Sequence, residues 1–134
     1  MFAPLPTPQE MAHWDRAAIH EAGVRNEMLM ENASREALRV LELEAGPLPG
    51  KRVLLYAGSG NNGGDAMALA RHLLDRGCQA RDVLVVHTRP KQDYRGVTAY
   101  HLRLAQRLGV HFAFLPRINL SSWLTRGHPD IVVD

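Results

Sequence analysis

From residue 51 onward, the apolar residues follow two alternating patterns. Short apolar runs predict strands at residues 53–57, 83–86, 110–115 and 131–133, and the nearly continuous run at 53–57 is typical of a parallel strand buried on both faces. Between these runs, apolar positions recur at helical spacing and predict helices at 65–76 and 93–108 and a short helical turn at 119–124. The expected inward faces are Ala66, Leu69, Ala70 and Leu73 on the first helix and Val97, Tyr100, Leu104 and Leu108 on the second. Strands that alternate with helices predict an α/β fold with a parallel sheet.

Residues 7–45 carry helical periodicity without strands. Thr7 as N-cap, followed by Pro8 and then by Glu10 three residues after the cap, predicts a capping box. A second helix is expected over residues 26–44. The apolar faces of the two helices are Met11, Trp14, Ala18 and Ile19, then Met30, Ala33, Ala37 and Leu41. A four-strand sheet with its own crossover helices cannot bury both faces fully, so we expect a homodimer.

Composition narrows the class of protein. The chain has 134 residues, 46% hydrophobic and 22% charged, which is typical of one globular domain over residues 1–134. Its net charge is +2 and its basic residues are spread along the chain, so we expect no nucleic-acid partner. The longest apolar run, 53–57, is far shorter than the roughly 20 residues of a membrane span. Cys78 is the single cysteine and the N-terminus lacks a signal-peptide pattern, so we expect a cytoplasmic protein with no membrane partner.

The predicted topology places a ligand site at one edge of the sheet. In a Rossmann-like, three-layer αβα fold, the first three strands extend in one direction and the fourth pairs beside the first. Ligands bind where this order reverses, at the carboxyl ends of the first and fourth strands. Asp134 follows the fourth strand, so we expect it to face the loop that follows the first strand.

The segment 58–65, Gly-Ser-Gly-Asn-Asn-Gly-Gly-Asp, joins the first strand to its helix. Its glycines fit G-x-G-x-x-G, in which backbone N–H groups and a helix N-terminus bind phosphate. Asn61, Asn62 and Asp65 add oxygens for a cation or for a ligand's polar edge, although Asp65 is equally well explained as a helix cap. The acid that holds a ribose in dinucleotide enzymes is missing after the second strand. Arg89 lies there instead, and an arginine at this place accommodates a 2′-phosphate.

This segment, followed by Ala-Arg-His-Leu at 70–73, resembles the signature of the YjeF N-terminal domain family, the NAD(P)H-hydrate epimerases. The leading helices are similar to that family in the same order and spacing. The matching positions are Asp15, Ala-Ala-Ile at 17–19, Gly23 and Leu-Met-Glu-Asn-Ala at 29–33. The resemblance covers essentially the whole chain.

The resemblance implies a Rossmann-like fold, a homodimer, and a bound potassium ion. It implies that the substrates are NADHX and NADPHX, the hydrated forms of the reduced nicotinamide cofactors, whose R and S epimers the family interconverts. The residues that it implies for substrate binding are Asn61, Asn62, Gly63, Gly64 and Asp65. It implies that Asn62 and Asp134 bind the potassium, and Asp134 is also the catalytic candidate.

Two features depart from the family pattern. Ala66 and Ser34 stand where the family usually has glycine, and both replacements are small. The family's strand that ends in the potassium-binding aspartate is normally followed by an F-G-T-G loop and further strands and helices, whereas Asp134 is the last residue here. We therefore expect the Rossmann-like part, 51–134, to be incomplete and this chain alone to have little epimerase activity.

Two other functions compete with that of an epimerase. The fold also resembles the dimerising domain of a decapping-enhancer scaffold, so the alternative is a non-catalytic, dimerising nucleotide-binding or scaffold module. The complete Asn-Asn-Gly-Gly-Asp stretch at 61–65 favours the enzyme. An ordinary NAD(P)-dependent oxidoreductase is disfavoured, because the acid after the second strand is missing and the side chains of 61–65 crowd the loop.

Overall fold

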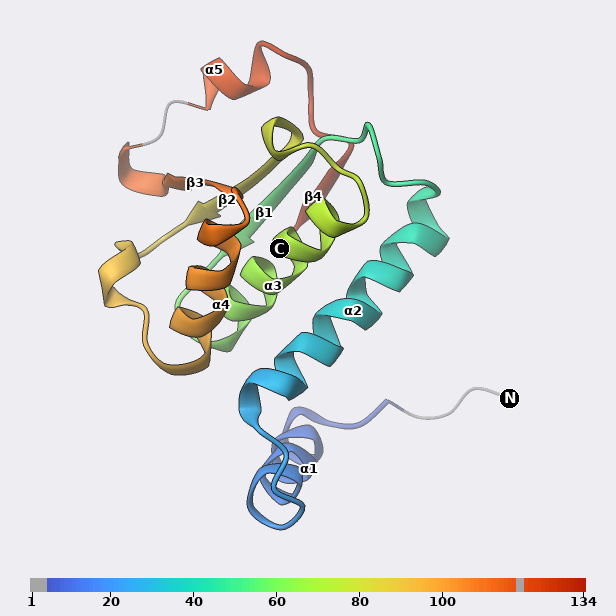
Figure 1. The fold of residues 1–134 in the computed structure, drawn as a ribbon, viewed down its shortest axis with the longest axis vertical. Coiled ribbons are helices and arrows are strands. Elements are labelled where there is room, and N and C mark those ends of the chain that lie inside the picture. The colour runs from blue at the N-terminus through green and yellow to red at the C-terminus, as the bar shows by residue number, and fades with distance from the viewer. Residues whose placement is uncertain (1–4, 118–119) are drawn as a thin grey trace.

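The computed structural model describes residues 5–117 and 120–134; two helices come first, and from β1 onward strands and helices alternate along the chain (Figure 1). The helices are α1 (Pro8–His20), α2 (Asn26–Ala45), α3 (Asn61–Asp75), α4 (Gly96–Arg107) and α5 (Ser121–Leu124). The strands are β1 (Val53–Ala57), β2 (Val83–His87), β3 (His111–Phe114) and β4 (Ile131–Val133). Short 3-10 turns lie at Ala80–Asp82, Lys91–Asp93 and Leu115–Arg117.

The four strands form one parallel sheet in the order β3-β2-β1-β4. Val53 of β1 pairs with Val83 of β2 on one side and with Ile131 of β4 on the other. Every residue of β1 and β2 is buried except Tyr56, which is half-buried, as the continuous apolar runs predict. The predicted parallel α/β topology, with the fourth strand beside the first, is confirmed.

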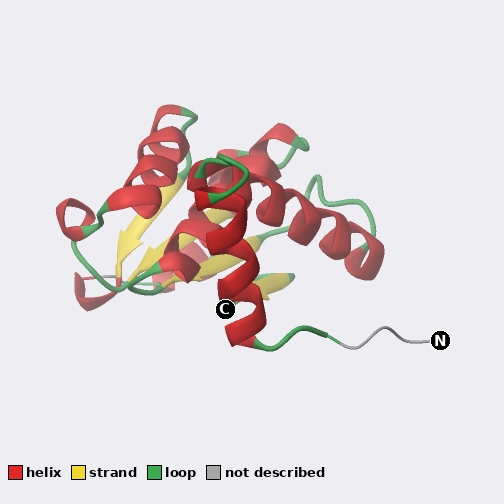
Figure 2. Cartoon of the chain, turned by 90° about the horizontal axis from the view of Figure 1, so that it is seen from below, coloured by secondary structure: helices red, strands yellow, loops and turns green. Residues whose placement is uncertain are grey.

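The two faces of the sheet are covered unequally. α3 and α4 lie against one face, α2 packs on α3, and the main apolar core fills this side of the molecule (Figure 2). The opposite face carries a smaller cluster of Leu54, Leu84 and Val86. Leu120 and Trp123, from the crossover that contains α5, pack against this cluster. The ends of the strands, where a ligand site is expected, therefore lie beside the α3 layer.

Arg52, just before β1, ties the crossover between β3 and β4 to the sheet. Its guanidinium lies 3.7 Å from the centroid of the Trp123 ring, donates to the Trp123 carbonyl at 2.6 Å, and donates to the carbonyl of Gly127. Its backbone N–H donates to Asp130 Oδ2 at 2.8 Å, and the Asp130 N–H donates to the Arg52 carbonyl at 2.8 Å. We call these contacts the Arg52 clasp. They fix the approach of β4 to β1.

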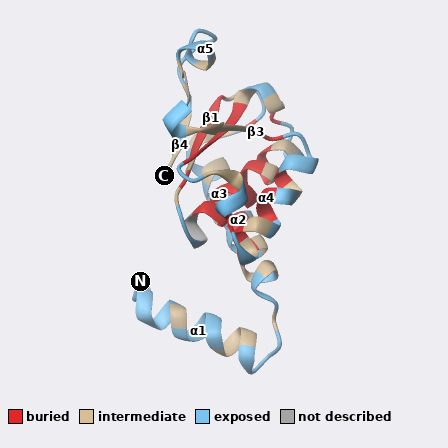
Figure 3. Cartoon of the chain, turned by 90° about the vertical axis from the view of Figure 1, so that its left-hand side faces the viewer, coloured by how far each residue is buried: buried red, intermediate tan, exposed pale blue. Residues whose placement is uncertain are grey.

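α1 stands apart from the sheet and its covering helices (Figure 3). The capping box is confirmed, because Glu10 N–H donates to Thr7 Oγ1 and Thr7 N–H donates to the Glu10 carboxylate, both at 3.1 Å. None of the α1 residues is buried, and Trp14 keeps 55% of its surface exposed. The predicted apolar face of α1 is therefore uncovered within the described part of the chain.

The predicted apolar face of α2 coincides only in part with the face that is buried. Met30 is buried, but the inward residues that follow are Ser34 and Leu38, and the predicted Ala33 and Ala37 are exposed. A count of apolar residues misses Ser34 because it is polar. Its hydroxyl donates to the Glu31 carbonyl at 2.9 Å, and this hydrogen bond offsets the free energy lost when the hydroxyl leaves water.

The predicted inward face of α4 is wrong for the same reason. The helix buries Thr98, His101, Leu102 and Ala105, whereas the predicted residues Val97, Tyr100, Leu104 and Leu108 are partly or well exposed. Two of the buried residues are polar and have partners. Thr98 Oγ1 donates to the Gly60 carbonyl at 3.0 Å, and His101 Nε2 lies 3.3 Å from the Glu27 carbonyl. Polar groups with partners therefore set the rotation of this helix.

Two helices begin at other residues than predicted. α3 begins at Asn61 instead of 65, because Gly60 turns the chain at a φ of 102° and the helix follows at once. Residues 61–64, expected in a loop, form its first turn. α4 begins at Gly96 instead of 93, because Lys91–Asp93 forms a separate 3-10 turn.

Candidate active site

The turn after β1 is held by hydrogen bonds from three directions. The Ala57 carbonyl, at the end of β1, accepts from the buried Tyr94 hydroxyl and from the Thr88 N–H, both at 3.1 Å. The Gly60 carbonyl accepts from Thr98 Oγ1 at 3.0 Å and from the Gly63 N–H at 3.2 Å. The turn is therefore a fixed edge between β1 and the first turn of α3.

Two glycines in the first turn of α3 are required by close packing. A Cβ at Gly63 would overlap the backbone oxygen of Gly58, and a Cβ at Gly64 would lie 2.5 Å from Met30 Sδ and 3.0 Å from Thr98 Oγ1. Both glycines are buried. Packing alone thus explains why glycine stands at both positions, and their contact with a substrate stays a prediction.

The two asparagines of the segment form the start of α3. The backbone of Asn61 and Asn62 belongs to the first helical turn, and their side chains lie outside the described parts of the structure. Their predicted contacts with the substrate, and that of Asn62 with potassium, stay predictions.

Asp65 and Asp134 line one cavity of about 260 Å³ between α2, α3, β1 and β4. We call it the carboxylate cavity. Ser34, Ala37 and Tyr56 also line it. Asp65 comes from the second turn of α3 and Asp134 from the end of β4, so the cavity lies where the strand order reverses, as the topology predicts. Two chain segments that are far apart in the sequence thus bring two carboxyl groups to one place.

The environment of Asp65 favours its protonated form. Burial raises the pKa of the Asp65 carboxyl above its ordinary value, and attraction to His101 offsets part of this rise. His101 is fully buried, and burial lowers the pKa of its imidazole. The sequence analysis missed His101, since its helix was predicted to face the core with other residues.

A buried ionic cluster around Glu31 lies between α2, α3 and α4. The Glu31 carboxylate pairs with the Arg71 guanidinium, lies 3.2 Å from His72 Nε2, and lies 4.0 Å from His101 Nδ1. Burial lowers the pKa of His72, against the opposing attraction of Glu31. Glu31 and Arg71 each fall within a stretch that resembles the family pattern, but spacing alone gave no sign that they meet.

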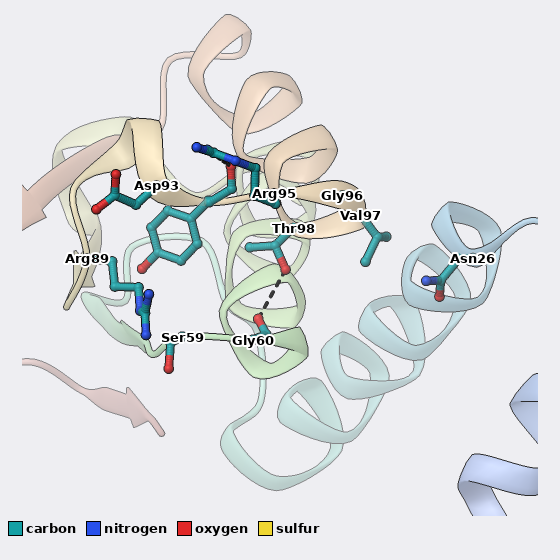
Figure 4. Close-up of a pocket in the computed structure, with 10 residues that line it drawn as sticks. Asn26, Ser59, Gly60, Arg89, Asp93, Arg95, Gly96, Val97 and Thr98 are labelled. Carbon is teal, nitrogen blue, oxygen red and sulfur yellow. Dashed lines mark hydrogen bonds between the residues drawn. The ribbon is translucent and has the colours of Figure 1, made fainter.

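A second cavity, of about 570 Å³, lies at the turn after β1, beside the start of α4 (Figure 4). We call it the arginine cavity. It is lined by Ser59 and Gly60 of the turn, by Arg89 after β2, and by Arg95 at the start of α4. Two cavities therefore lie near the connection between β1 and α3, one with two carboxyl groups and one with two guanidinium groups.

Residues 5–117 and 120–134 contain neither a cluster of metal-ligating side chains nor a membrane-spanning helix. No group of three or more His, Cys, Asp or Glu side chains is placed to hold a metal ion. No helix in these ranges combines the length and the apolar character needed to cross a membrane.

Comparisons with known proteins identify relatives over most of the chain. It is 38% identical over 106 residues to the bifunctional NAD(P)H-hydrate repair enzyme Nnr of Moorella thermoacetica, a match that covers 78% of this chain and 19% of that protein. It is 38% identical over 104 residues to the NAD(P)H-hydrate epimerase of Weissella koreensis, covering 78% of this chain and 45% of that protein. The NAD(P)H-hydrate epimerase of Pirellula staleyi is likewise 38% identical, over 103 residues, with coverage of 77% and 43%.

The fold has a counterpart among solved structures. The crystal structure of a yeast protein, YNL200c, matches with a TM-score of 0.79 at 22% identity, over 98% of this chain and 56% of that one. The chain thus spans about half, or less, of the length of these relatives. A family model described as YjeF-related protein N-terminus matches residues 26–134, from the start of α2 through β4 and Asp134. On this match and the identities above, the chain belongs to the family of YjeF-related protein N-termini.

Proposed function

We propose that this chain is the catalytic part of an NAD(P)H-hydrate epimerase, which interconverts the R and S epimers of NADHX and NADPHX. Relatives that carry this name support the proposal. The observation that carries it is the carboxylate cavity, where Asp65, with its raised pKa, and Asp134 line one space at the carboxyl ends of β1 and β4.

The reaction inverts a carbon that bears a hydroxyl group, so it needs a group that gives and takes a proton. A carboxyl whose pKa is raised toward neutrality is suited to this task, because both of its protonation states are accessible. Asp65 is the candidate for this task, because it is half-buried and burial raises the pKa of its carboxyl above the ordinary value. Asp134 is exposed on the opposite wall, and its carboxylate has two roles to be separated by experiment: proton transfer and cation binding.

Potassium is the cation proposed for this cavity. A hard cation prefers oxygen ligands, and the Asp134 carboxylate on the cavity wall is of that type. Asn62, in the first turn of α3, is the second proposed ligand. Bound there, the ion would offset the negative charge of the carboxylates and stabilise oxygen atoms of the substrate.

The test follows the conversion of one NADPHX epimer into the other, with potassium present. Because little activity is expected of residues 1–134 alone, it uses a form of the protein that extends through the loop expected after Asp134, and the Asp65→Asn variant of that form. Loss of the proton-transfer group should lower kcat/KM by about 100-fold or more. Asp75→Asn is the matched control, because Asp75 is an exposed aspartate at the other end of the same helix. Equal rates for wild type and Asp65→Asn would contradict the assignment.

Asp134→Asn separates the two roles of Asp134. A potassium ligand predicts that the variant needs a higher potassium concentration for half-maximal rate, whereas proton transfer predicts a lower rate at saturating potassium. Substrate binding is measured separately, by calorimetry with a non-reacting NADPH analogue, so that a slow enzyme is distinguished from one that does not bind.

We also propose that the protein is a homodimer through α1 and α2. These helices expose large apolar side chains, including Trp14 at 55%, Met28 at 54% and Leu43 at 70%. Light scattering at micromolar concentration should give twice the chain mass, and Trp14→Glu should shift it toward the monomer. Leu108→Glu, an equally exposed position at the end of α4, is the control. A dimer that binds the nucleotide without turnover would favour the scaffold alternative.

A further inference from the structure

The arginine cavity is open at the carboxyl ends of β1 and β2, and it is lined by different residues from the carboxylate cavity. The proposed epimerase reaction uses none of its charged residues. Its volume of about 570 Å³ is twice that of the carboxylate cavity, at about 260 Å³, and is large enough for part of a nucleotide.

Arg89 and Arg95 line this cavity, neither has an acidic partner among the residues that the structure describes, and Figure 4 shows their guanidinium groups pointing to opposite sides. Within residues 5–117 and 120–134, the structure assigns no hydrogen bond or ion pair to the Arg89 side chain, while Arg95 donates to the backbone carbonyls of Gln92 and Tyr94. Asp93 also lines the cavity, which leaves two positive groups against one negative group. Figure 4 shows Arg89 on the side of Ser59, with the Asp93 carboxylate turned away from Gly60.

The position of Arg89 is fixed by the residue that ends β2. His87 is 4% exposed, and its Nδ1 donates to the Arg89 carbonyl at 2.6 Å. The His87 ring stacks on Phe114 with the ring centroids 5.4 Å apart. The backbone of Arg89 is thus anchored to the sheet, and its side chain extends from a rigid point beside the turn.

Three helix N-termini contribute to the walls of the cavity, which is an independent source of positive potential. Asn26 is the first residue of α2, Gly60 precedes α3, and Arg95 and Gly96 begin α4. No side chain caps any of these three helices, and neither α3 nor α4 has an acidic residue in its first turn. Their N–H groups and helix dipoles add to the charge of the two arginines.

We propose that the arginine cavity binds a phosphomonoester dianion, which in the substrate of the proposed epimerase is the 2′-phosphate that distinguishes NADPHX from NADHX. The choice of this phosphate rests on the proposed function and on the place of Arg89. An arginine just after the second strand of a Rossmann-like sheet is where a 2′-phosphate is accommodated. The Arg89 guanidinium would bind the phosphate through charge-assisted, bidentate hydrogen bonds. The nicotinamide end would then extend across the turn toward Asp65.

The experiment compares two probes by calorimetry at low salt: ADP-ribose, and ADP-ribose that carries a 2′-phosphate. The wild-type protein should bind the phosphorylated probe about tenfold more tightly or better. Arg89→Gln should abolish this preference and leave the affinity for ADP-ribose unchanged. Arg107→Gln, which removes an exposed arginine at the far end of α4, should keep the preference.

The outcomes separate this proposal from the proposed function. No preference in the wild type, or an equal preference in Arg89→Gln, overturns the phosphate site even if both epimers are interconverted. A preference that depends on Arg89, in a protein that fails to convert either epimer, supports the phosphate site and counts against the epimerase. Unchanged circular dichroism and unfolding midpoint of Arg89→Gln establish that a lost preference does not come from misfolding.

Discussion

The two cavities near the connection between β1 and α3 are lined by different residues and differ in size and charge. The carboxylate cavity is small, closed by α2 and β4, and its acid Asp65 is half-buried with a raised pKa. The arginine cavity is larger, and Arg89 and Arg95 are exposed to solvent. Burial tunes proton affinity, whereas exposure keeps a guanidinium free to meet an anion. The two proposals together give one strand-to-helix connection two tasks, a reaction in one cavity and phosphate binding in the other.

The largest expected effect comes from the connection between β1 and α3, which lies near both cavities. Gly63→Ala should lower the free energy of unfolding by about 3 kcal/mol, because its Cβ would meet the backbone oxygen of Gly58, which cannot move aside cheaply. Binding in both cavities should weaken together. Urea unfolding measures the stability, and Gly58→Ala is the control, since a Cβ there meets nothing within 4 Å. A variant as stable as Gly58→Ala would show that the turn is not rigid.

The second prediction, of intermediate size, is a loss of stability and of activity that concerns the carboxylate cavity alone. Arg52→Met removes the side-chain contacts of the Arg52 clasp, leaves the carbonyls of Trp123 and Gly127 without their donor, and should cost about 2 kcal/mol in urea unfolding. Since β4 carries Asp134, epimerase activity should fall while binding in the arginine cavity persists. Arg126→Met is the control, because both arginines pair with Asp82, Arg52 at 3.8 Å and Arg126 at 3.9 Å, but the Arg126 side chain is 45% exposed. Equal losses in both cavities would contradict their independence.

The smallest effect is a gain in stability. Burial raises the pKa of Asp65, so the folded state favours the protonated carboxyl, and the protein loses stability as pH rises from the ordinary value of 3.8 through the raised value. An asparagine at this position does not ionise, so it carries no cost of burying a charge. Asp65→Asn should therefore be about 1 kcal/mol more stable than the wild type at pH 7, and this difference should vanish in acid. Urea unfolding at both pH values measures it; a difference that grows in acid has the wrong sign.

Strand positions and their order followed from the sequence because parallel buried strands need continuous apolar runs. The same topology brought Asp134 and Asp65 to one cavity, although β4 and α3 are far apart in the chain. The buried faces of the helices were harder to predict, because they include the polar residues Ser34, Thr98 and His101. Hydrogen bonds satisfy these side chains in the interior, and the spacing of apolar residues does not indicate such bonds.

The start of α3 was misplaced because glycines were read as loop residues. In the structure, Gly63 and Gly64 belong to the helix and pack closely against Gly58 and Met30. These contacts join residues that only the three-dimensional fold brings together. The meeting of Glu31 with Arg71, His72 and His101 depends on how three helices are rotated, so the sequence analysis missed it. The arginine cavity was predicted only in part, through Arg89. Arg95 was not predicted to line the cavity, because it was expected inside a helix that begins at residue 93, whereas α4 begins at Gly96.

The Arg52 clasp has a consequence for the time course of folding. It joins Arg52 to Asp130 across 78 positions of the chain, whereas β1, α3 and β2 are consecutive and pair over short distances in sequence. Closing a long loop costs more chain entropy before any contact repays it, so β4 should join the sheet after β1 and β2 have paired. By the same reasoning, the amides of β4 should exchange with deuterium sooner than those of β1. The wall that carries Asp134 is then the last part of the site to assemble and the first to open.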